Sequence, residues 1–273
     1  MERQPRVTIV TPTYNSEDYL EKCILSVKNQ RCSNLEHIVV DGGSKDGTLS
    51  ILKKYEGTYC LKWISEPDQG MYDAINKGFA MASGDIMAWL NSDDYYFPWT
   101  IEVVIKAFED CGIEWLSGIP SNTKKMGTAD IPYLLPNLPT VYNSRMIKKG
   151  VYDGVRMYYV QQESCFWSRS LWEKAGGLKT EYRLAGDYYL WREFSKYSKL
   201  YTINCNLASF RIHENQMSSD KEEYSREAKA KRWPSFLNNI LQVYLQIYSL
   251  IYYRRFVINI DRLYRNDKRE KDA

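Results

Sequence analysis

Apolar residues recur at two different spacings along the first 90 residues of the chain. Short runs rich in β-branched residues predict strands, and segments with apolar residues every three or four positions predict helices. The two kinds of segment alternate, which is the βαβ order of a parallel sheet covered by helices on both faces. In chain order, the predicted elements are Val7–Thr11, Ser16–Asn29, His37–Asp41, Thr48–Tyr55, Leu61–Ser65, Met71–Met81 and Ile86–Leu90.

The first predicted helix, Ser16–Asn29, carries a signal for where it begins. Asn15 precedes it and Asp18 follows three residues later, a spacing that favours an N-cap with acidic support. The apolar residues of this segment share one helical face: Tyr19, Leu20, Cys23, Ile24 and Val27.

The pattern weakens in the middle of the chain. Residues 119–160 carry four prolines among many tyrosines, and this composition predicts a loop-rich insertion. Aromatic side chains in and next to it can stack on sugar faces or fill the core, and the sequence leaves both roles open. These residues are Tyr133, Tyr142, Tyr152, Tyr158, Tyr159 and Trp167. The regular elements predicted on either side of the insertion are Trp99–Glu109, Trp115–Ser117, Ser170–Ala175, Tyr188–Tyr197 and Leu200–Ile203.

Charge divides the chain into a body and a tail. The 273 residues are 44% hydrophobic and 26% charged, which is a globular composition. Residues 221–273 hold 12 Lys and Arg against 7 Asp and Glu, whereas residues 1–220 hold 25 against 27. A nearly neutral body with a basic tail argues against a nucleic-acid-binding protein. It favours one local electrostatic contact made by the tail.

The tail is predicted to form an amphipathic helix. Residues 236–260 are densely apolar, but polar side chains interrupt any uniform span of about 20 residues, so this is a poor transmembrane helix. Basic residues follow, and we expect a peripheral contact with an anionic membrane surface. A helix packed on the body, or on a second copy in a homo-oligomer, is the alternative. The interrupting residues are Asn238, Asn239, Gln242 and Gln246, and the basic ones are Arg254, Arg255, Arg262, Arg265, Lys268, Arg269 and Lys271.

The cysteines and the N-terminus bear on the cellular compartment. The six cysteines show neither CxxC pairs nor Cys/His ligand spacing, so neither a disulfide framework nor a structural zinc site is indicated. The first residues run directly into a predicted strand, without a hydrophobic signal region. We therefore expect a cytoplasmic protein at the inner face of the cell membrane.

Small, polar and acidic residues follow four of the predicted strands. Ligands bind beyond the carboxyl ends of the strands in an open parallel sheet, so the four clusters predict one binding rim. The rim lacks both the GxGxxG and the Walker A motif. Its acidity suggests a divalent metal that bridges carboxylates and a diphosphate, with Asp93 and Asp94 as the best ligands. The clusters are Thr11–Asn15, Asp41–Ser44, Glu66–Gly70 and Asn91–Asp94.

Five ordered stretches of the sequence resemble a family-2 glycosyltransferase of the GT-A fold. The resemblance implies an α/β fold with a Rossmann-like, mostly parallel central sheet flanked by helices. It implies a catalytic domain over residues 1–220, with a nucleotide-sugar half over about 1–98 and an acceptor half over about 99–220. A C-terminal helical extension over 221–273 would follow. The matching stretches are Val7–Asn15, His37–Thr48, Ser65–Gly78, Ser83–Asp94 and Ala185–Trp191.

The same resemblance implies a reaction. A sugar would move from a nucleotide-diphosphate donor, here a UDP-sugar, to a hydroxyl of a glycan or lipid-linked glycan in cell-surface polysaccharide synthesis. The transfer would be inverting and would depend on a divalent cation, Mn²⁺ or Mg²⁺.

The resemblance also points to the donor-binding residues. Asp41 could accept the imide N–H of uracil and so select uridine over cytidine, or it could simply cap the following Gly42–Gly43 turn. Asn15 and Asn91 stand where the family often has acidic residues, and we assign the ribose to Asn91 or Asp93. The predicted donor-binding residues are Thr11, Pro12, Thr13, Tyr14, Asn15, Asp41, Gly43, Ser44, Asp68, Gly70, Asp73, Lys77, Asn91, Ser92 and Asp93.

The metal is assigned chiefly to Asp94, with Asp93 beside it. The alternative is that the two aspartates cap the next helix. His213 lies in polar sequence after the last predicted strand, where the family often places a histidine that closes over the metal and pyrophosphate. A surface histidine is the alternative for this residue. The other histidine, His37, lies in an apolar strand and is interpreted as a core residue.

Asp187 is predicted to be the general base, because it corresponds to the base of the family. It lies at the start of a predicted helix, where the helix dipole favours the ionised carboxylate, but a simple N-cap would be placed in the same way. Glu163 is the competing acid, and binding of the acceptor is its favoured role.

Two other functions are kept as alternatives. A nucleotidyltransferase acting on sugar phosphates would also use a metal and an α/β sheet, but its donor loop should be rich in glycine and basic residues. A non-catalytic carbohydrate-binding module would be favoured if Asp94 or Asp187 were missing, and both are present.

Overall fold

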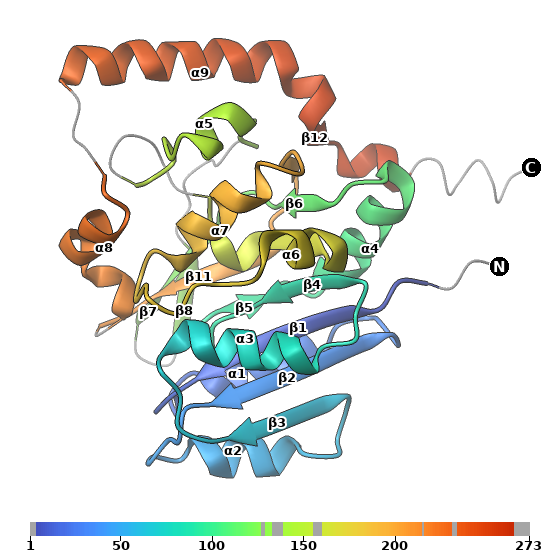
Figure 1. Ribbon diagram of the computed structural model, residues 1–273. Coiled ribbons are helices and arrows are strands. Elements are labelled where there is room, and N and C mark those ends of the chain that lie inside the picture. Colours follow the sequence, from blue (N-terminus) through green and yellow to red (C-terminus); the bar gives the residue numbers. More distant parts are fainter. Residues whose placement is uncertain are drawn as a thin grey trace, which may run out of the picture.

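The computed structural model describes residues 4–264 except for 127–128, 133–138, 155–159, 215 and 231–233. Its central sheet has eight strands in the order β12-β10-β6-β9-β4-β1-β2-β3. All neighbours in this sheet run parallel except β9, which is antiparallel to both β4 and β6. The expected α/β architecture with a mostly parallel sheet is confirmed (Figure 1).

The first half of the chain has the predicted βαβ order. Residues of β1, β2 and β4 are buried throughout, because helices cover both faces of the sheet. Alternate residues of one strand therefore enter different cores: Val10 packs in the cluster that contains α3, and Ile9 packs in the cluster that contains α4. The elements are β1 Val7–Thr13, α1 Leu20–Lys28, β2 Leu35–Asp41, α2 Thr48–Tyr55, β3 Leu61–Ser65, α3 Met71–Met81 and β4 Ile86–Trp89.

The start of α1 was predicted wrongly. The helix begins at Leu20, and Tyr19 rather than Asn15 occupies the N-cap position, without a side-chain cap. Asn15 instead has a left-handed backbone with φ of 47°. Its side-chain oxygen accepts a hydrogen bond from Lys45 N at 2.9 Å, so it joins two loops of the rim instead of capping the helix.

The second half of the chain adds a smaller sheet with the order β5-β11-β7-β8. Strands β7 and β8 and helix α5 lie within the region predicted to be loop-rich, so that prediction was only partly right. Strand β9 was not predicted. The elements are β5 Tyr95–Tyr96, α4 Thr100–Cys111, β6 Trp115–Ser117, β7 Asn122–Met126, β8 Ala129–Pro132, α5 Ser144–Lys148, η1 Gln162–Ser164, β9 Cys165–Ser168, α6 Arg169–Ala175, α7 Gly186–Phe194, β10 Tyr201–Ile203, β11 Ala208–Ile212, η2 Met217–Ser219 and α8 Lys221–Glu227.

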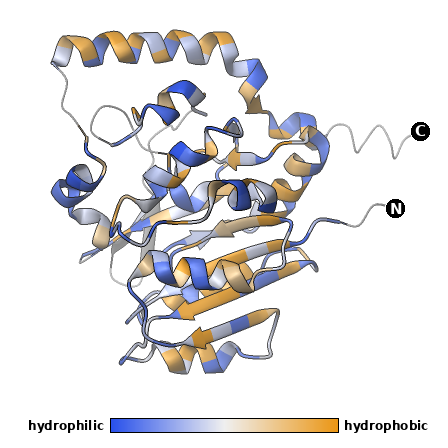
Figure 2. Ribbon diagram, viewed as in Figure 1, coloured by the Kyte–Doolittle hydropathy of each residue, from blue (hydrophilic) through white to orange (hydrophobic). Residues whose placement is uncertain are grey.

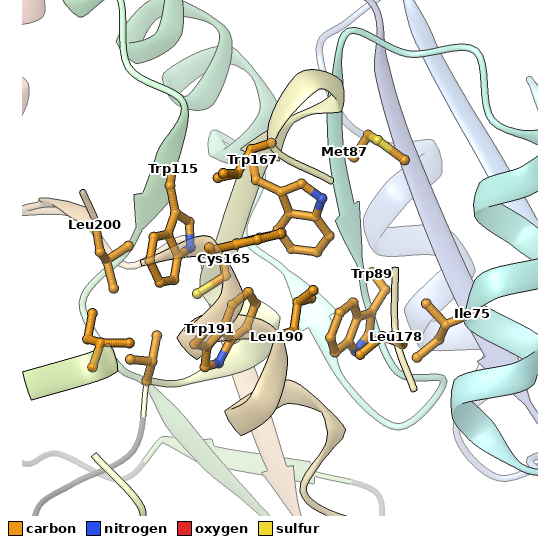
Figure 3. Close-up of a cluster of buried hydrophobic side chains, with 14 of the residues drawn as sticks. Ile75, Met87, Trp89, Trp115, Cys165, Trp167, Leu178, Leu190, Trp191 and Leu200 are labelled. Atoms are coloured by element: carbon orange, nitrogen blue, oxygen red, sulfur yellow. The ribbon is translucent and has the colours of Figure 1, made fainter. Parts of the chain in front are cut away.

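Four tryptophans join α7 to the middle of the central sheet. The ring of Trp191 on α7 lies 5.5 Å from Trp115, 5.8 Å from Trp167 and 6.0 Å from Trp89, measured between ring centroids. The four rings pack together in one cluster (Figure 3). Each such aromatic pair contributes about 0.5–1.5 kcal/mol beyond simple burial. This packing fixes the position of α7 over β4, β6 and β9.

The C-terminal segment is not a separate tail. Helix α9, Ser235–Phe256, lies along one side of the molecule, and β12, Val257–Ile258, pairs with β10 at the edge of the central sheet (Figure 1). Leu241 and Leu245 of α9 pack in one core cluster and Leu263 packs in another. The proposed boundary after residue 220 therefore cuts through the packed fold.

Hydrophobic and hydrophilic residues alternate along helix α9 (Figure 2). Leu241, Leu245 and Phe256 are buried, whereas a second set of large apolar side chains faces outward. In the described part of the chain, no helix combines the length and apolarity needed to cross a membrane. The basic residues Arg265, Lys268, Arg269 and Lys271 of the predicted tail lie outside the described residues. The outward-facing set is Phe236, Leu237, Ile240, Val243, Tyr244, Ile247, Leu250, Ile251 and Tyr253.

Candidate active site

The predicted rim forms where the parallel strands end. Thr13 at the end of β1 is paired with Asp41 at the end of β2, and Asp41 is paired with Ser65 at the end of β3. On the other side of β1, Leu90 N donates a hydrogen bond to Val10 O and so aligns the residues that follow β4. The strand register therefore brings the four clusters to one edge of the sheet.

Asp41 is fully buried beneath the turn that follows it. Its Oδ2 accepts hydrogen bonds from Gly43 N at 3.1 Å, Ser44 N at 3.0 Å and Ser65 Oγ at 2.6 Å. Its Oδ1 accepts a hydrogen bond from Ser44 Oγ at 2.5 Å. Asp41 thus caps the turn in this structure, and its recognition of uracil stays a prediction.

The cluster Thr11–Asn15 at the end of β1 is partly buried and partly exposed at the rim. Thr11 is buried, and its Oγ1 is 3.0 Å from Nε2 of His37. His37 is a core residue as predicted, because it is fully buried and burial lowers its pKa to about 3. Tyr14 is 60% exposed, and Asn15 N donates a hydrogen bond to Ser44 Oγ at 2.7 Å. Tyr14 and Asn15 are therefore the residues of this loop that a donor can reach.

The turn after β3 is held by its own acidic residues. Asp68 Oδ1 accepts a hydrogen bond from Gly70 N at 2.8 Å, and Asp73 Oδ2 accepts one from Gln69 N at 3.0 Å. Lys77 Nζ lies 2.9 Å from a Glu66 carboxylate oxygen and 3.3 Å from an Asp73 oxygen. Lys77 is thus engaged with neighbouring carboxylates of its own turn, which shapes the rim at this point.

Asp93 and His213 meet at the end of β4. Asp93 Oδ2 is 3.0 Å from His213 Nε2, although 120 residues separate them in sequence. The imidazole of His213 stacks on the Tyr19 ring at 4.3 Å between centroids, which fixes its plane. The Asp93 carboxylate holds the pKa of His213 above its ordinary value. Ser92 Oγ lies 2.9 Å from Ser16 Oγ and so ties this loop to the segment before α1.

Asp94, the neighbour of Asp93, is joined to strand β11. Its side chain is fully buried, and Oδ1 accepts a hydrogen bond from Arg211 N of β11 at 2.9 Å. Burial, with the nearby charges of Asp93 and Glu163, raises its pKa well above the ordinary value. Asp94 Oδ1 thus joins β11 to the β4 loop, and Asp93 is the residue beside His213, while the role of Asp94 as chief metal ligand stays a prediction.

Asp187 and Glu163 approach the rim from the second half of the chain. Asp187 lies in the first turn of α7, half-buried, and Oδ1 accepts a hydrogen bond from Tyr188 N at 2.7 Å. Burial raises its pKa to about 7. Glu163, in η1, is buried, and burial together with the charges of Asp93 and Asp187 raises its pKa. Glu163 thus interacts electrostatically with both Asp93 and Asp187.

The residues present fit a divalent cation. Asp93 and His213 offer an oxygen and a nitrogen donor side by side, and the surrounding carboxyl groups favour positive charge. Three buried oxygens of the rim have no hydrogen-bond donor among the described residues: Asn91 Oδ1, Asp94 Oδ2 and Glu163 Oε1. Within the same residues, no group of three or more His, Cys, Asp and Glu forms a complete protein cage. The donor set therefore fits a cation that also takes ligands from a diphosphate.

Several residues at the site were not singled out from the sequence. The Arg211 guanidinium lies 5.5 Å from both the Tyr19 and the Tyr95 ring, and its charge acts on Asp94. Arg211 and His213 are two residues apart, and side chains at this spacing lie on the same side of an extended segment. This spacing could have indicated that Arg211 lies near the site. Tyr142, Tyr152 and Trp167 belong to the core. Tyr133, Tyr158 and Tyr159 lie outside the described residues.

Comparisons with known proteins agree on one family. The profile described as Glycosyl transferase family 2 matches residues 8–175. An uncharacterized glycosyltransferase of Mycobacterium tuberculosis is 30% identical over 213 residues, which are 77% of this chain and 76% of the relative. The hyaluronan synthase of Pasteurella multocida is 35% identical over 107 residues, which are 39% of this chain and 11% of that protein.

Solved structures share the fold at low sequence identity. Staphylococcus aureus TarS 1-349 in complex with UDP-GlcNAc superposes with a TM-score of 0.64 at 20% identity, over 82% of this chain and 65% of that one. The mannosyltransferase PcManGT of Pyrobaculum calidifontis, in complex with GDP-Man and Mn²⁺, gives a TM-score of 0.60 at 18% identity. That match covers 89% of this chain and 70% of the mannosyltransferase.

The structural role of Asp94 predicts how its variants affect stability. Asp94→Ala leaves a buried N–H of Arg211 without its acceptor, so the free energy of unfolding should fall by about 1–3 kcal/mol. Asp94→Asn keeps an oxygen acceptor for Arg211 N. Because the pKa of Asp94 is higher in the folded than in the unfolded protein, its carboxyl group lowers the free energy of unfolding at neutral pH, so this variant should be at least as stable as the wild type. Denaturant unfolding at pH 7 measures both, with Asp93→Ala as the matched control. Wild-type stability of Asp94→Ala would contradict this role.

Proposed function

This chain belongs to glycosyl transferase family 2, and from that premise we propose that it moves a sugar from a UDP-sugar to a hydroxyl of a glycan or lipid-linked glycan in cell-surface polysaccharide synthesis. Family membership removes the nucleotidyltransferase alternative and makes the chain an enzyme rather than a binding module. The observation that carries the proposal is the convergence of the Asp93–His213 pair with the buried Glu163 and the half-buried Asp187 at one rim.

The metal assignment follows from the Asp93–His213 pair. We propose that Asp93 Oδ2 and His213 Nε2 hold Mn²⁺ or Mg²⁺, the cofactor expected from the sequence. When bound, such a cation supplies positive charge against the diphosphate as it leaves. The chain contributes the orientation of both donors: the Tyr19 ring fixes the imidazole, and the Asp94–Arg211 hydrogen bond holds β11 so that His213 reaches Asp93.

Asp187 is the proposed general base of an inverting displacement. Its carboxylate takes the proton from the acceptor hydroxyl, while that oxygen bonds to the anomeric carbon. The bond from the anomeric carbon to the phosphate oxygen breaks, and the nucleoside diphosphate leaves with the bonding electrons. A base with a pKa of about 7 is well matched to proton transfer near neutral pH.

Glu163 is proposed to bind the acceptor or the transferred sugar. Because its pKa is raised by burial, the protonated form is favoured, and a carboxylic acid can donate a hydrogen bond to a sugar oxygen. Glu163 Oε1 is buried and has no hydrogen-bond partner among the described residues, so it has capacity for such a contact.

We also propose that α9 places the enzyme at the inner face of the cell membrane. Its outward-facing apolar set includes Ile247, 53% exposed, and Leu250, 81% exposed, and the helix ends in Arg254 and Arg255. An apolar face next to basic residues fits an anionic lipid surface, with each basic residue near the surface contributing about 1 kcal/mol. A lipid-linked acceptor would be reached from that position.

The metal assignment predicts selective loss of metal-dependent donor binding. Asp93→Asn and His213→Ala should each weaken UDP binding in the presence of Mn²⁺ by about tenfold or more, and should leave binding in EDTA unchanged. Isothermal titration calorimetry measures the affinity, and Asp110→Asn on α4 is the control because Asp110 forms a surface ion pair with Lys106. Undiminished Mn²⁺-dependent affinity in both variants would sink the assignment.

The base assignment predicts a change in turnover rather than in binding. Asp187→Asn should lower kcat by about 10²-fold or more while UDP affinity stays near wild type. In the wild-type enzyme kcat/KM should rise with pH through about 7, because only the ionised form accepts a proton and burial raises the Asp187 pKa to about 7. Steady-state kinetics across pH checks both. If Glu163→Gln shows this pattern and Asp187→Asn does not, the base is Glu163.

The α9 proposal predicts binding to anionic vesicles. The double substitution Ile247→Glu with Leu250→Glu should abolish flotation with such vesicles but leave transfer to a soluble acceptor analogue unchanged, because both side chains point away from the core. Gln242→Glu with Gln246→Glu adds the same charge at exposed polar positions of α9 and is the control. High salt should weaken flotation without abolishing it. A wild-type protein that never floats would contradict the membrane proposal.

A further inference from the structure

The segment before Asp187 is held by side chains from elsewhere in the chain. Helix α7 begins at Gly186, and its N-cap residue Ala185 makes no side-chain cap. The first N–H groups of a helix need acceptors from outside the helix. Glu227 of α8 binds the three N–H groups that immediately precede the helix: Oε1 accepts from Arg183 N at 2.8 Å, and Oε2 accepts from Leu184 N and Ala185 N, each at 2.8 Å.

Tyr72 of α3 completes this arrangement from the opposite side. Its hydroxyl donates a hydrogen bond to Leu184 O at 2.7 Å and accepts one from Gly186 N at 2.9 Å. Four successive backbone N–H groups, 183 to 186, thus have side-chain acceptors from two distant elements. A Cβ added to Gly186 would lie 2.6 Å from the Tyr72 ring, so the ring and this backbone are in close contact.

Helix α8 is itself fixed against α7. Tyr189 Oη donates a hydrogen bond to Glu227 O at 3.0 Å, and Ala228 packs in a buried cluster with Ala185 and Tyr188. The carboxylate of Glu227 therefore has little freedom to move away from the segment it binds.

We infer that Glu227 is a positioning residue for Asp187: it fixes the backbone from which the Asp187 carboxylate reaches the acceptor hydroxyl, and it places a fixed negative charge near that carboxylate. This inference rests on the proposed role of Asp187 as the base. It assigns to α8 a function in the reaction, although α8 lies beyond the region that the sequence marked as catalytic.

The charge of Glu227 makes it possible to distinguish a role in the reaction from a purely structural role. The titratable groups that act electrostatically with Asp187 are Tyr72 of α3, Glu163 of η1, Cys165 of β9 and Glu227 of α8. Burial is the largest cause of the raised pKa of Asp187, backbone hydrogen bonds from Tyr188 and Asp187 act against it, and the charge of Glu227 raises the pKa as the smallest of these four causes. Removing its charge should therefore lower the pH at which the base becomes ionised.

The experiment compares Glu227→Gln with Glu223→Gln in the full chain. Glu223 lies one turn earlier on α8 and pairs with Arg226, so it is a matched control. We expect Glu227→Gln to lower kcat about tenfold or more, to leave UDP affinity unchanged, and to move the acid limb of the kcat/KM profile to lower pH. Glu223→Gln should keep the wild-type profile. A fall in kcat with an unmoved acid limb would overturn the inference, because loss of folded enzyme lowers rates without shifting that limb.

Two further variants separate this inference from the proposed function. Tyr72→Phe removes the hydroxyl that bonds to Leu184 O and Gly186 N, but it removes no formal charge. The kcat should therefore fall while the acid limb stays in place. A wild-type kcat in this variant would count against the inference even if Glu227→Gln fails to fold. In an Asp187→Asn background, Glu227→Gln should cause no additional loss of kcat. If Asp187→Asn alone retains wild-type kcat, the base assignment fails. If it loses kcat and Glu227→Gln has no effect, only the inference fails.

Discussion

The concentration of carboxyl groups at one edge of the central sheet is the constraint on which the site depends. Asp93, Asp94 and Glu163 act on one another electrostatically, and Asp187 acts on Glu163. Like charges at close range in a partly buried site cannot all be ionised without a counter-charge. The structure meets this constraint by burying Asp94 and Glu163, which favours their neutral forms, and by bringing the Arg211 guanidinium and the His213 imidazole to the rim. A divalent cation supplies the remaining positive charge in the proposed enzyme.

The chain uses acidic side chains for two distinct purposes at this rim. Some face the site, as Asp93 and Asp187 do, and others accept backbone N–H groups, as Asp41, Asp94 and Glu227 do. The acids that accept backbone N–H groups hold the segments that carry the acids facing the site. Asp94 holds β11, which brings His213 to Asp93, and Glu227 holds the segment that carries Asp187. Hydrogen bonds from backbone N–H groups to acidic side chains thus connect segments that are far apart in the sequence.

This dual use explains what the sequence could and could not reveal. The βαβ order and the rim followed from hydrophobic periodicity and from the rule that parallel strands end at one edge, and both are present. Two adjacent aspartates are equivalent in a one-dimensional pattern, however, so Asp93 and Asp94 could not be told apart. Their difference arises from pairing with a strand that begins more than 100 residues later. The position of Asn15 failed as an N-cap for a similar reason, because its partner Lys45 belongs to another loop.

The C-terminal segment shows the same dependence on distant partners. Its apolar density suggested one amphipathic face, whereas α9 has two: Leu241 and Leu245 pack on the body, and Ile247 and Leu250 face outward. A helix that is apolar on two sides, with polar residues between them, is neither strongly amphipathic nor apolar enough to span a membrane. Because β12 then joins the central sheet beside β10, the outward face is rigidly connected to the domain that carries Asp187. A surface that docks through α9 would therefore hold the active site in a defined orientation, which a flexible tail could not do.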